Sequence, residues 1–219
     1  MRRGRARIVF LVAALWPVAA GAADLSYDGQ SGAAAQRAAD ALRSHAPGFD
    51  RSAAVPTAGA VADAVRSGQA AGGVIPAMAA DGVPNDTARL LLGAVDPDVR
   101  ITGEADIVNA SGGAECFWMI VRSAGRTPEQ HPDRLVVTVE APGGSKAFSL
   151  VVAGLSKIGF TVVAVASVAL PGKPFGYRYL LALAADRPVL VLRATDAMAR
   201  DSRVGEGRAL LIGEWKRGP

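Results

Sequence analysis

The sequence predicts two units, an α/β unit followed by an α+β unit. Apolar runs alternate with alanine-rich helical stretches in the first half, and this alternation is typical of α/β folds. In the second half, apolar and helical stretches follow one another in the order βαββαβ, which is the order of a ferredoxin-like plait. A connector with prolines and charges, residues 123–133, lies between the halves and is typical of a linker. We therefore expect one domain over 23–122 and another over 134–219.

Residues 1–22 have the pattern of a secretory signal peptide. Four arginines within the first seven residues precede an apolar run over 8–18, and the small residues Ala20-Gly21-Ala22 follow. The apolar run is shorter than the roughly 20 residues that a membrane-spanning helix needs. We therefore expect the leader to be removed and the protein to be exported to the periplasm or the medium, with no membrane contact afterwards.

The charge of the chain depends on this leader. The sequence has 24 Lys and Arg against 20 Asp and Glu, and four of the arginines lie in the leader, so the remaining charges balance at 20 each. This balance gives no support for a nucleic-acid partner. A single cysteine, Cys116, excludes an intrachain disulfide. We predict neither a cofactor nor a metal site, because His45 and His131 lack the spacing of metal ligands.

The first half contains the signals of an α/β unit. Thr57 suits the N-cap of a helix that ends at Ser67-Gly68. Residues 116–121 are apolar throughout, as expected of a central parallel strand that is covered on both faces. The other expected elements are a strand over 24–27, a helix over 33–44, a strand over 73–76, a helix over 86–92 and a strand over 100–109.

The second half is patterned more regularly. A helix is predicted over 145–158 because Phe148, Val151 and Leu155 recur at helical spacing, and Gly159 ends it. The turn at 171–174, with two prolines and a glycine, reverses the chain. The remaining elements are expected as strands over 135–140, 161–170, 177–184 and 209–215 and a helix over 187–200.

Four segments, in this order and spacing, carry a resemblance to a known family: "SGQAAGGVIP", "VRITGE", "PGKPFGYRYLLALA" and "ALLIGEW". From about Leu25 to Trp215 the chain resembles prephenate dehydratase with a C-terminal ACT domain. The resemblance implies a periplasmic-binding-protein-like α/β domain and then an ACT domain that senses phenylalanine. It implies a link to L-phenylalanine biosynthesis, in which the family, a group of carbon–oxygen lyases, decarboxylates and dehydrates prephenate to phenylpyruvate.

The family's catalytic motifs are incomplete here. Its Glu-Asn-Ser loop falls on Met78, Ala79 and Ala80. Its Thr-Arg-Phe motif falls on Glu115, Cys116 and Phe117, where only the phenylalanine matches. Its glycine-rich loop keeps Tyr27, Gly29 and Gly32, but the Thr-Phe-Ser that follows reads as three alanines.

Two physical arguments agree with an inactive protein. Prephenate is a dicarboxylate, so its pocket needs converging cations or backbone donors, and an anionic Glu115 would repel it. The leaving hydroxyl also needs a positioned acid, which alanine and methionine cannot supply. In addition, only residues 105–114 separate Glu104 from Glu115, where the family has a second lobe. We expect a truncated, catalytically degenerate relative, a pseudoenzyme.

The predicted ligand site lies in the second half. The family's effector site is near the first strand–helix turn and the second strand of the ACT domain. Gly143, Gly144 and Ser145 supply the turn here, where backbone N–H groups could receive a carboxylate, and Ser167 is retained on the second strand. The alternative is an ordinary loop. The expected ligand is a small aromatic compound or an amino acid.

Three hypotheses follow for the whole protein. The first is a non-catalytic module that binds or senses an amino acid; the second is an active prephenate dehydratase that uses unrecognised groups. The third is a structural or interaction protein that dimerises through the ACT domain, since ACT domains commonly pair by sheet edges. Cys116 is open to three interpretations: a nucleophile, a free thiol that links two chains, or a buried inert thiol. Its apolar strand favours the third.

Overall fold

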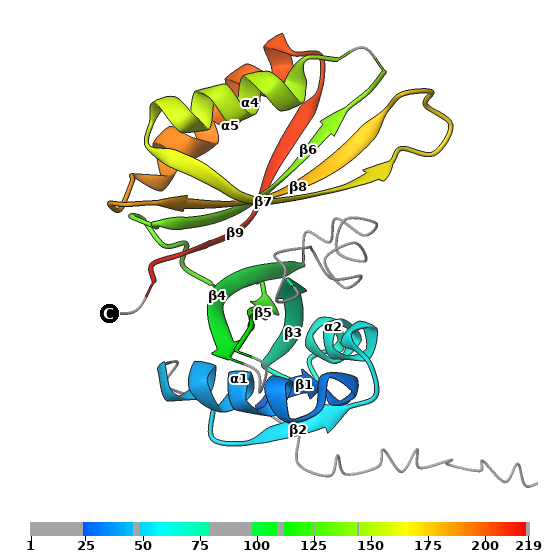
Figure 1. The fold of residues 1–219 in the computed structure, drawn as a ribbon, viewed down its shortest axis with the longest axis vertical. Helices are drawn as coiled ribbons and strands as arrows, with labels where there is room; N and C mark the ends of the chain where they lie inside the picture. The colour runs from blue at the N-terminus through cyan, green and yellow to red at the C-terminus, as the bar shows by residue number, and fades with distance from the viewer. Residues whose placement is uncertain are drawn as a thin grey trace, which may run out of the picture.

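The computed structural model describes residues 24–45, 49–78, 98–108, 112–124, 126–143 and 145–217. Within these ranges, nine strands form one sheet in the order β2-β1-β3-β5-β4-β9-β6-β8-β7. Figure 1 shows the N-terminal half of the chain at one end of this sheet and the C-terminal half at the other. The predicted helix over 86–92 lies outside the described residues.

The N-terminal half contains the α/β alternation that was predicted. Its elements are β1 (Leu25–Asp28), the short 3-10 helix η1 (Gly29–Ser31), α1 (Gly32–His45), β2 (Ser52–Val55), α2 (Ala58–Ser67), β3 (Gly72–Met78), β4 (Val99–Val108) and β5 (Ala114–Arg122). The Thr57 side chain accepts a hydrogen bond from Ala60 N, and Gly68 ends α2 in the left-handed conformation, as the sequence predicts. The strand β2 was missed because it is four residues long, contains two alanines and lies at the sheet edge.

The orientation predicted for residues 116–121 was wrong. β5 is antiparallel to both of its neighbours, β3 and β4. Only residues 109–113 join β4 to β5, whereas a parallel crossover takes a dozen residues or more. The run is nevertheless covered on both faces, because Phe117 packs in the cluster with α1 and Trp118 in the cluster with α2.

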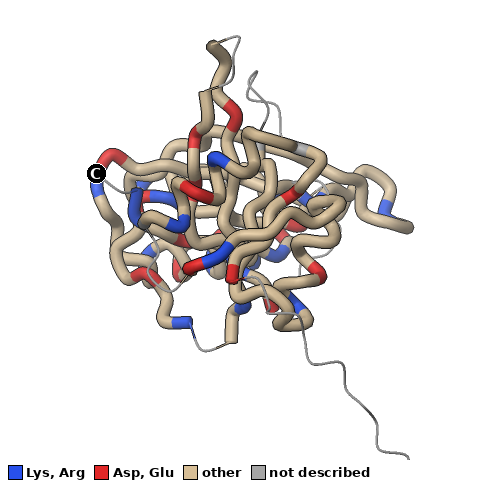
Figure 2. Tube along the Cα trace, turned by 90° about the horizontal axis from the view of Figure 1, so that it is seen from below, with Lys and Arg blue, Asp and Glu red and all other residues tan. Residues whose placement is uncertain are grey.

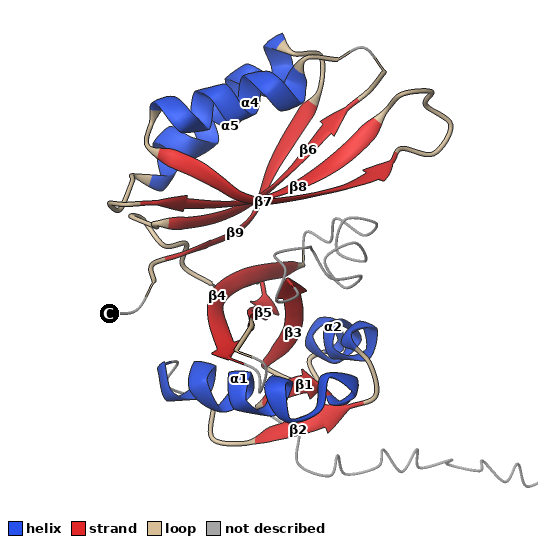
Figure 3. Cartoon of the chain, viewed as in Figure 1, coloured by secondary structure: helices blue, strands red, loops and turns tan. Residues whose placement is uncertain are grey.

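The C-terminal half has the predicted order βαββαβ. It comprises β6 (Arg134–Ala141), α4 (Ala147–Lys157), β7 (Phe160–Ala169), β8 (Tyr177–Ala185), α5 (Val191–Val204) and β9 (Arg208–Trp215). Both helices cover the same face of the strands β9-β6-β8-β7 (Figures 1 and 3). Helix α5 starts four residues later than predicted. Backbone hydrogen bonds hold the preceding segment outside the helix: Val189 N donates to Pro132 O and Val191 N to Gln130 O, both at 2.9 Å.

The two halves share a core and a strand pairing. β4 and β9 are parallel and pair at Ile101 and Gly213. One cluster of buried residues includes Val61 of α2 and Trp118 of β5 together with Leu180 of β8 and Trp215 of β9. The sheet and this core are therefore continuous across the boundary between the expected domains.

Basic and acidic residues are interspersed along the described chain, as Figure 2 shows. Among the described residues, no helix combines the length and the apolar composition needed to cross a bilayer.

Candidate functional site

The positions of the family's catalytic motifs meet at one edge of the N-terminal sheet. The parallel strands β1, β3 and β4 end there, and β5 begins there because it runs the opposite way. Met78 lies opposite Cys116 on the neighbouring strand, Pro76 lies opposite Phe117, and Glu115 lies opposite Ile107. Ala79 and Ala80 lie outside the described residues. The pairing therefore brings together the positions onto which the resemblance drawn from the sequence maps the family's separate motifs.

The glycine-rich loop after β1 has a well-defined backbone geometry. The Asp28 carboxylate accepts a hydrogen bond from Gln30 N at 3.0 Å and caps η1. Gly32 has a φ of 54°, in the region that favours glycine. A Cβ at Gly29 would lie 3.0 Å from Val55 O. Backbone conformation at Gly32 and close packing at Gly29 therefore favour glycine at these two positions.

The three β5 side chains onto which the Thr-Arg-Phe motif falls are poor in catalytic groups. Phe117 is fully buried, Cys116 is 7% exposed and Glu115 is half-buried. Burial raises the pKa of the Cys116 thiol, and the nearby carboxylates of Glu104 and Asp106 raise it further. A thiol in these surroundings stays protonated at neutral pH, and only the thiolate is a good nucleophile. The interpretation of Cys116 as a buried, inert thiol agrees with this geometry.

One cation reaches the edge from α1. Arg37 donates through one guanidinium nitrogen to Val108 O at 3.3 Å, which fastens the helix to the end of β4. The sequence analysis missed this contact, because the two residues are 71 positions apart and no motif connects them. Arg37 is exposed, and its hydrogen bond to a backbone carbonyl holds α1 against the end of β4.

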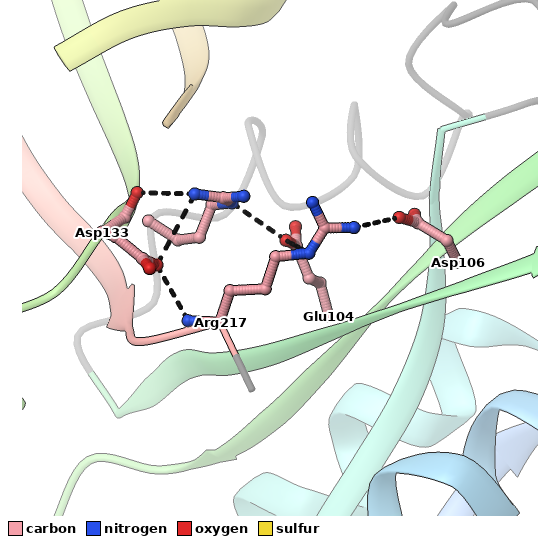
Figure 4. A network of polar contacts seen from close by, with 5 residues as sticks. Glu104, Asp106, Asp133 and Arg217 are labelled. Carbon is pink, nitrogen blue, oxygen red and sulfur yellow. Dashed lines mark hydrogen bonds and ion pairs between the residues drawn. The ribbon is translucent and has the colours of Figure 1, made fainter. Parts of the chain in front are cut away.

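A second polar cluster lies where the two halves meet (Figure 4). Glu104 of β4 accepts a hydrogen bond from Arg134 Nε of β6 at 3.0 Å. Arg217, after β9, donates to Asp106 at 3.0 Å through its side chain and to the Asp133 carboxylate at 2.8 Å through its backbone N–H. These contacts tie three segments together and were not predicted, because they depend on how the halves pack.

The electrostatics of this cluster are set by burial. Burial raises the pKa of Glu104 above its ordinary value, although the neighbouring Arg134 and Arg217 act in the opposite direction. The neighbouring Asp106 raises it further. Both carboxylates already have arginine partners, so the cluster is a joint between the halves with no free group for chemistry.

The predicted ligand turn is engaged in structural contacts. The Ser145 hydroxyl donates to Gly205 O at 2.5 Å and accepts from Ala147 N at 3.1 Å. A Cβ at Gly143 would lie 2.4 Å from Pro174 O, in the turn between β7 and β8. Gly144 lies outside the described residues.

The remaining predicted residue, Ser167, lies near the same end of the plait. It is exposed on β7, opposite Tyr179 of β8. Through Tyr179 the register places Ser167 level with Val139, before the turn that follows β6, and β8 lies between the two strands, so Ser167 and the turn are more than about 10 Å apart. The fold thus places Gly143 and Ser145 in one turn, and among the described residues no contact joins Ser167 to that turn.

Comparison with known proteins identifies the class of fold. No protein-family profile matches the chain, and no curated protein is similar to it in sequence. Among solved structures, the mixed α/β architecture with its nine-stranded sheet resembles prephenate dehydratases.

Three of these structures illustrate the likeness. A prephenate dehydratase from Streptococcus mutans has a TM-score of 0.69 and 13% identity, over 89% of this chain and 98% of its own. A prephenate dehydratase from Arthrobacter aurescens, in complex with L-Phe, has a TM-score of 0.64 and 14% identity, over 88% and 89%. GqqA, described as a novel type of quorum-quenching acylase, has a TM-score of 0.63 and 21% identity, over 89% and 95%. At these identities the likeness establishes the fold.

Proposed function

We propose that this chain is an exported, non-catalytic relative of prephenate dehydratase that binds an amino acid and serves a regulatory role linked to aromatic amino-acid metabolism. One observation is the main support for the proposed loss of catalysis. The sheet edge where the family has its catalytic groups carries the anionic Glu115, the buried Cys116 and the buried Phe117.

The connection between β4 and β5 supports the same conclusion. The family has its second lobe at this point in the chain, and here residues 109–113 join two antiparallel strands directly. Among the described residues, this direct connection leaves no second lobe after β4 that would exclude water or supply the cations that a dicarboxylate needs. The alternative of an active dehydratase requires an acid and a dicarboxylate site from groups elsewhere in the chain.

Retention of the second half supports a binding role. Its βαββαβ order and strand order fit an ACT domain, and the related dehydratase from Arthrobacter aurescens was solved with L-Phe. The interaction hypothesis has support of its own. The edge strand β7 exposes Val163 by 56% and Val165 by 43%, which suits pairing with a second copy.

Two assays on the purified protein test the proposal. We expect no formation of phenylpyruvate from prephenate, measured by absorbance against an active dehydratase as the control. We expect L-phenylalanine or another apolar amino acid to raise the melting temperature by mass action, since a ligand at about 100 times its Kd adds about 2.7 kcal/mol to the free energy of unfolding. Turnover of prephenate would refute the proposal. The absence of a shift with every amino acid would leave the interaction hypothesis in its place.

A further inference from the structure

A cavity of about 510 Å³ lies at the end of the plait opposite the predicted ligand turn. Its walls come from the end of α4 and from the segment that joins β8 to α5. The turn at Gly143 and Ser145 instead precedes α4 and contacts Gly205, which follows α5. Since the start of α4 lies against the end of α5, the cavity and the turn are at opposite ends of the helix pair.

The cavity combines an apolar wall with charged groups. Ile158, Pro188 and Val189 line it, and Ile158 and Val189 also pack against the core under the helices. Asp186, Arg187 and Arg193 line it as well, all three with exposed side chains. Its volume is within the range of about 300–1,000 Å³ that is usual for small-molecule sites.

The charged groups of the cavity are available to a ligand. Among the described residues, the side chains of Asp186, Arg187 and Arg193 have no hydrogen-bond or ion-pair partner. Elsewhere in the described chain, arginines such as Arg134 and Arg178 are paired with glutamates. Two unpaired guanidinium groups with one carboxylate suit a small molecule that carries both signs of charge.

The wall is also held in place before any ligand binds. Ala185 N donates to Asp133 O at 2.8 Å, Val189 N to Pro132 O at 2.9 Å, and Val191 N to Gln130 O at 2.9 Å. These bonds fasten the segment on both sides of Asp186 and Arg187 to residues 130–133. A pre-formed wall lowers the entropy cost of binding.

We propose that this cavity is a binding site for a zwitterionic α-amino acid with an apolar side chain. Arg187 and Arg193 bind the carboxylate, Asp186 binds the ammonium group, and the apolar side chain of the ligand packs on Ile158 and Val189. The inference rests on the proposed function, because it names the site at which this chain binds an amino acid.

Titration calorimetry on the purified full protein tests the site with L-phenylalanine and L-leucine as probes. We expect Arg187→Gln and Arg193→Gln each to lower the association constant by about tenfold, the effect of losing one charge-assisted hydrogen bond. Asp186→Asn should weaken L-phenylalanine binding and leave binding of N-acetyl-L-phenylalanine, which lacks the ammonium group, unchanged. Circular dichroism shows whether each variant is folded.

Arg203→Gln is the matched control, because Arg203 is exposed on the same helix at its other end. Amide NMR shifts give a second measurement, with changes expected at Gly159 and Arg193 and none at Gly143 and Ser145. If the wild type binds the amino acid and both cavity variants bind it equally well, the site is elsewhere and the proposed function survives. If the wild type binds neither amino acid, the proposed function itself fails.

Discussion

The contact between Arg126 and Glu214 shows how firmly the predicted linker is attached, and replacing Arg126 by methionine tests it. Arg126 donates to the Glu214 carboxylate at 2.5 Å through one guanidinium nitrogen and to Glu214 O at 3.1 Å through another. The Glu214 side chain is 3% exposed and the Arg126 side chain 21% exposed. Methionine keeps much of the packing of the arginine stem and removes the charge.

The expected loss follows from the burial of the carboxylate. Removing one partner of a buried ion pair costs about 3–5 kcal/mol, because the other charge stays buried and unpaired. Arg126 retains some exposure, so we expect the lower end, about 3 kcal/mol. For a chain of this size, each kcal/mol lowers the melting temperature by about 2–4 °C, which gives about 6–12 °C in all. Replacing both partners by methionine should recover part of the loss, because no unpaired charge then remains.

Thermal denaturation followed by circular dichroism measures both variants. The control is Arg43→Met, which breaks a more exposed ion pair with Asp40 (3.2 Å) and should cost less than about 1 kcal/mol. If Arg126→Met lowers the melting temperature by no more than the control Arg43→Met does, the reasoning is refuted. It would mean that residues 123–133 behave in solution as the free linker that the sequence suggests.

Two further predictions concern the joint between β4 and β9. Gly213→Ala places a Cβ 2.6 Å from Ile101 Cβ, so we expect it to lower the free energy of unfolding by about 1–3 kcal/mol, measured by urea denaturation. The control Gly59→Ala places its Cβ 3.7 Å from Thr57 Oγ1 and should cost nothing. Equal urea midpoints for the two variants would contradict the prediction. Burial raises the pKa of Glu104 above the ordinary value of 4.5, so the folded state binds this proton more tightly than the unfolded state does. The free energy of unfolding of the wild type should therefore fall, relative to that of Glu104→Gln, as the pH rises through the raised pKa. Unfolding free energies of the two proteins that stay parallel between pH 4 and 7 would show that the carboxyl group is not perturbed.

Much of the fold could be predicted because it is encoded locally. The cap at Thr57, the left-handed Gly68 and the apolar spacing of α4 mark element boundaries within a few residues of the chain. The orientation of β5 was not recoverable from its composition, since an apolar strand covered on both faces can pair in either direction. The start of α5 depends on hydrogen bonds to Gln130 and Pro132, which lie about 60 residues earlier in the chain.

The candidate sites were predictable to different degrees. The burial of Cys116 follows from its apolar run, and the structure agrees. The cluster of Glu104, Arg134 and Arg217 joins segments far apart in sequence, so no spacing rule could find it. The cavity at Arg187 and Arg193 likewise depends on how the end of α4 lies against the segment before α5, so no motif spacing could indicate it.

The altered residues at the first sheet edge and the short β4–β5 connection are best understood as one change. The resemblance drawn from the sequence implies that the family has, at the position of Cys116, an arginine that pairs with a substrate carboxylate. Here Cys116 lies between Met78 of β3 and Asp106 of β4 and is almost fully buried. An arginine at this position would lose much of its hydration in a space fitted to a thiol, and an unpaired buried charge costs several kcal/mol. A small apolar residue at 116 is therefore favoured by the packing of this sheet edge alone, and we expect Cys116→Arg to destabilise the fold by several kcal/mol.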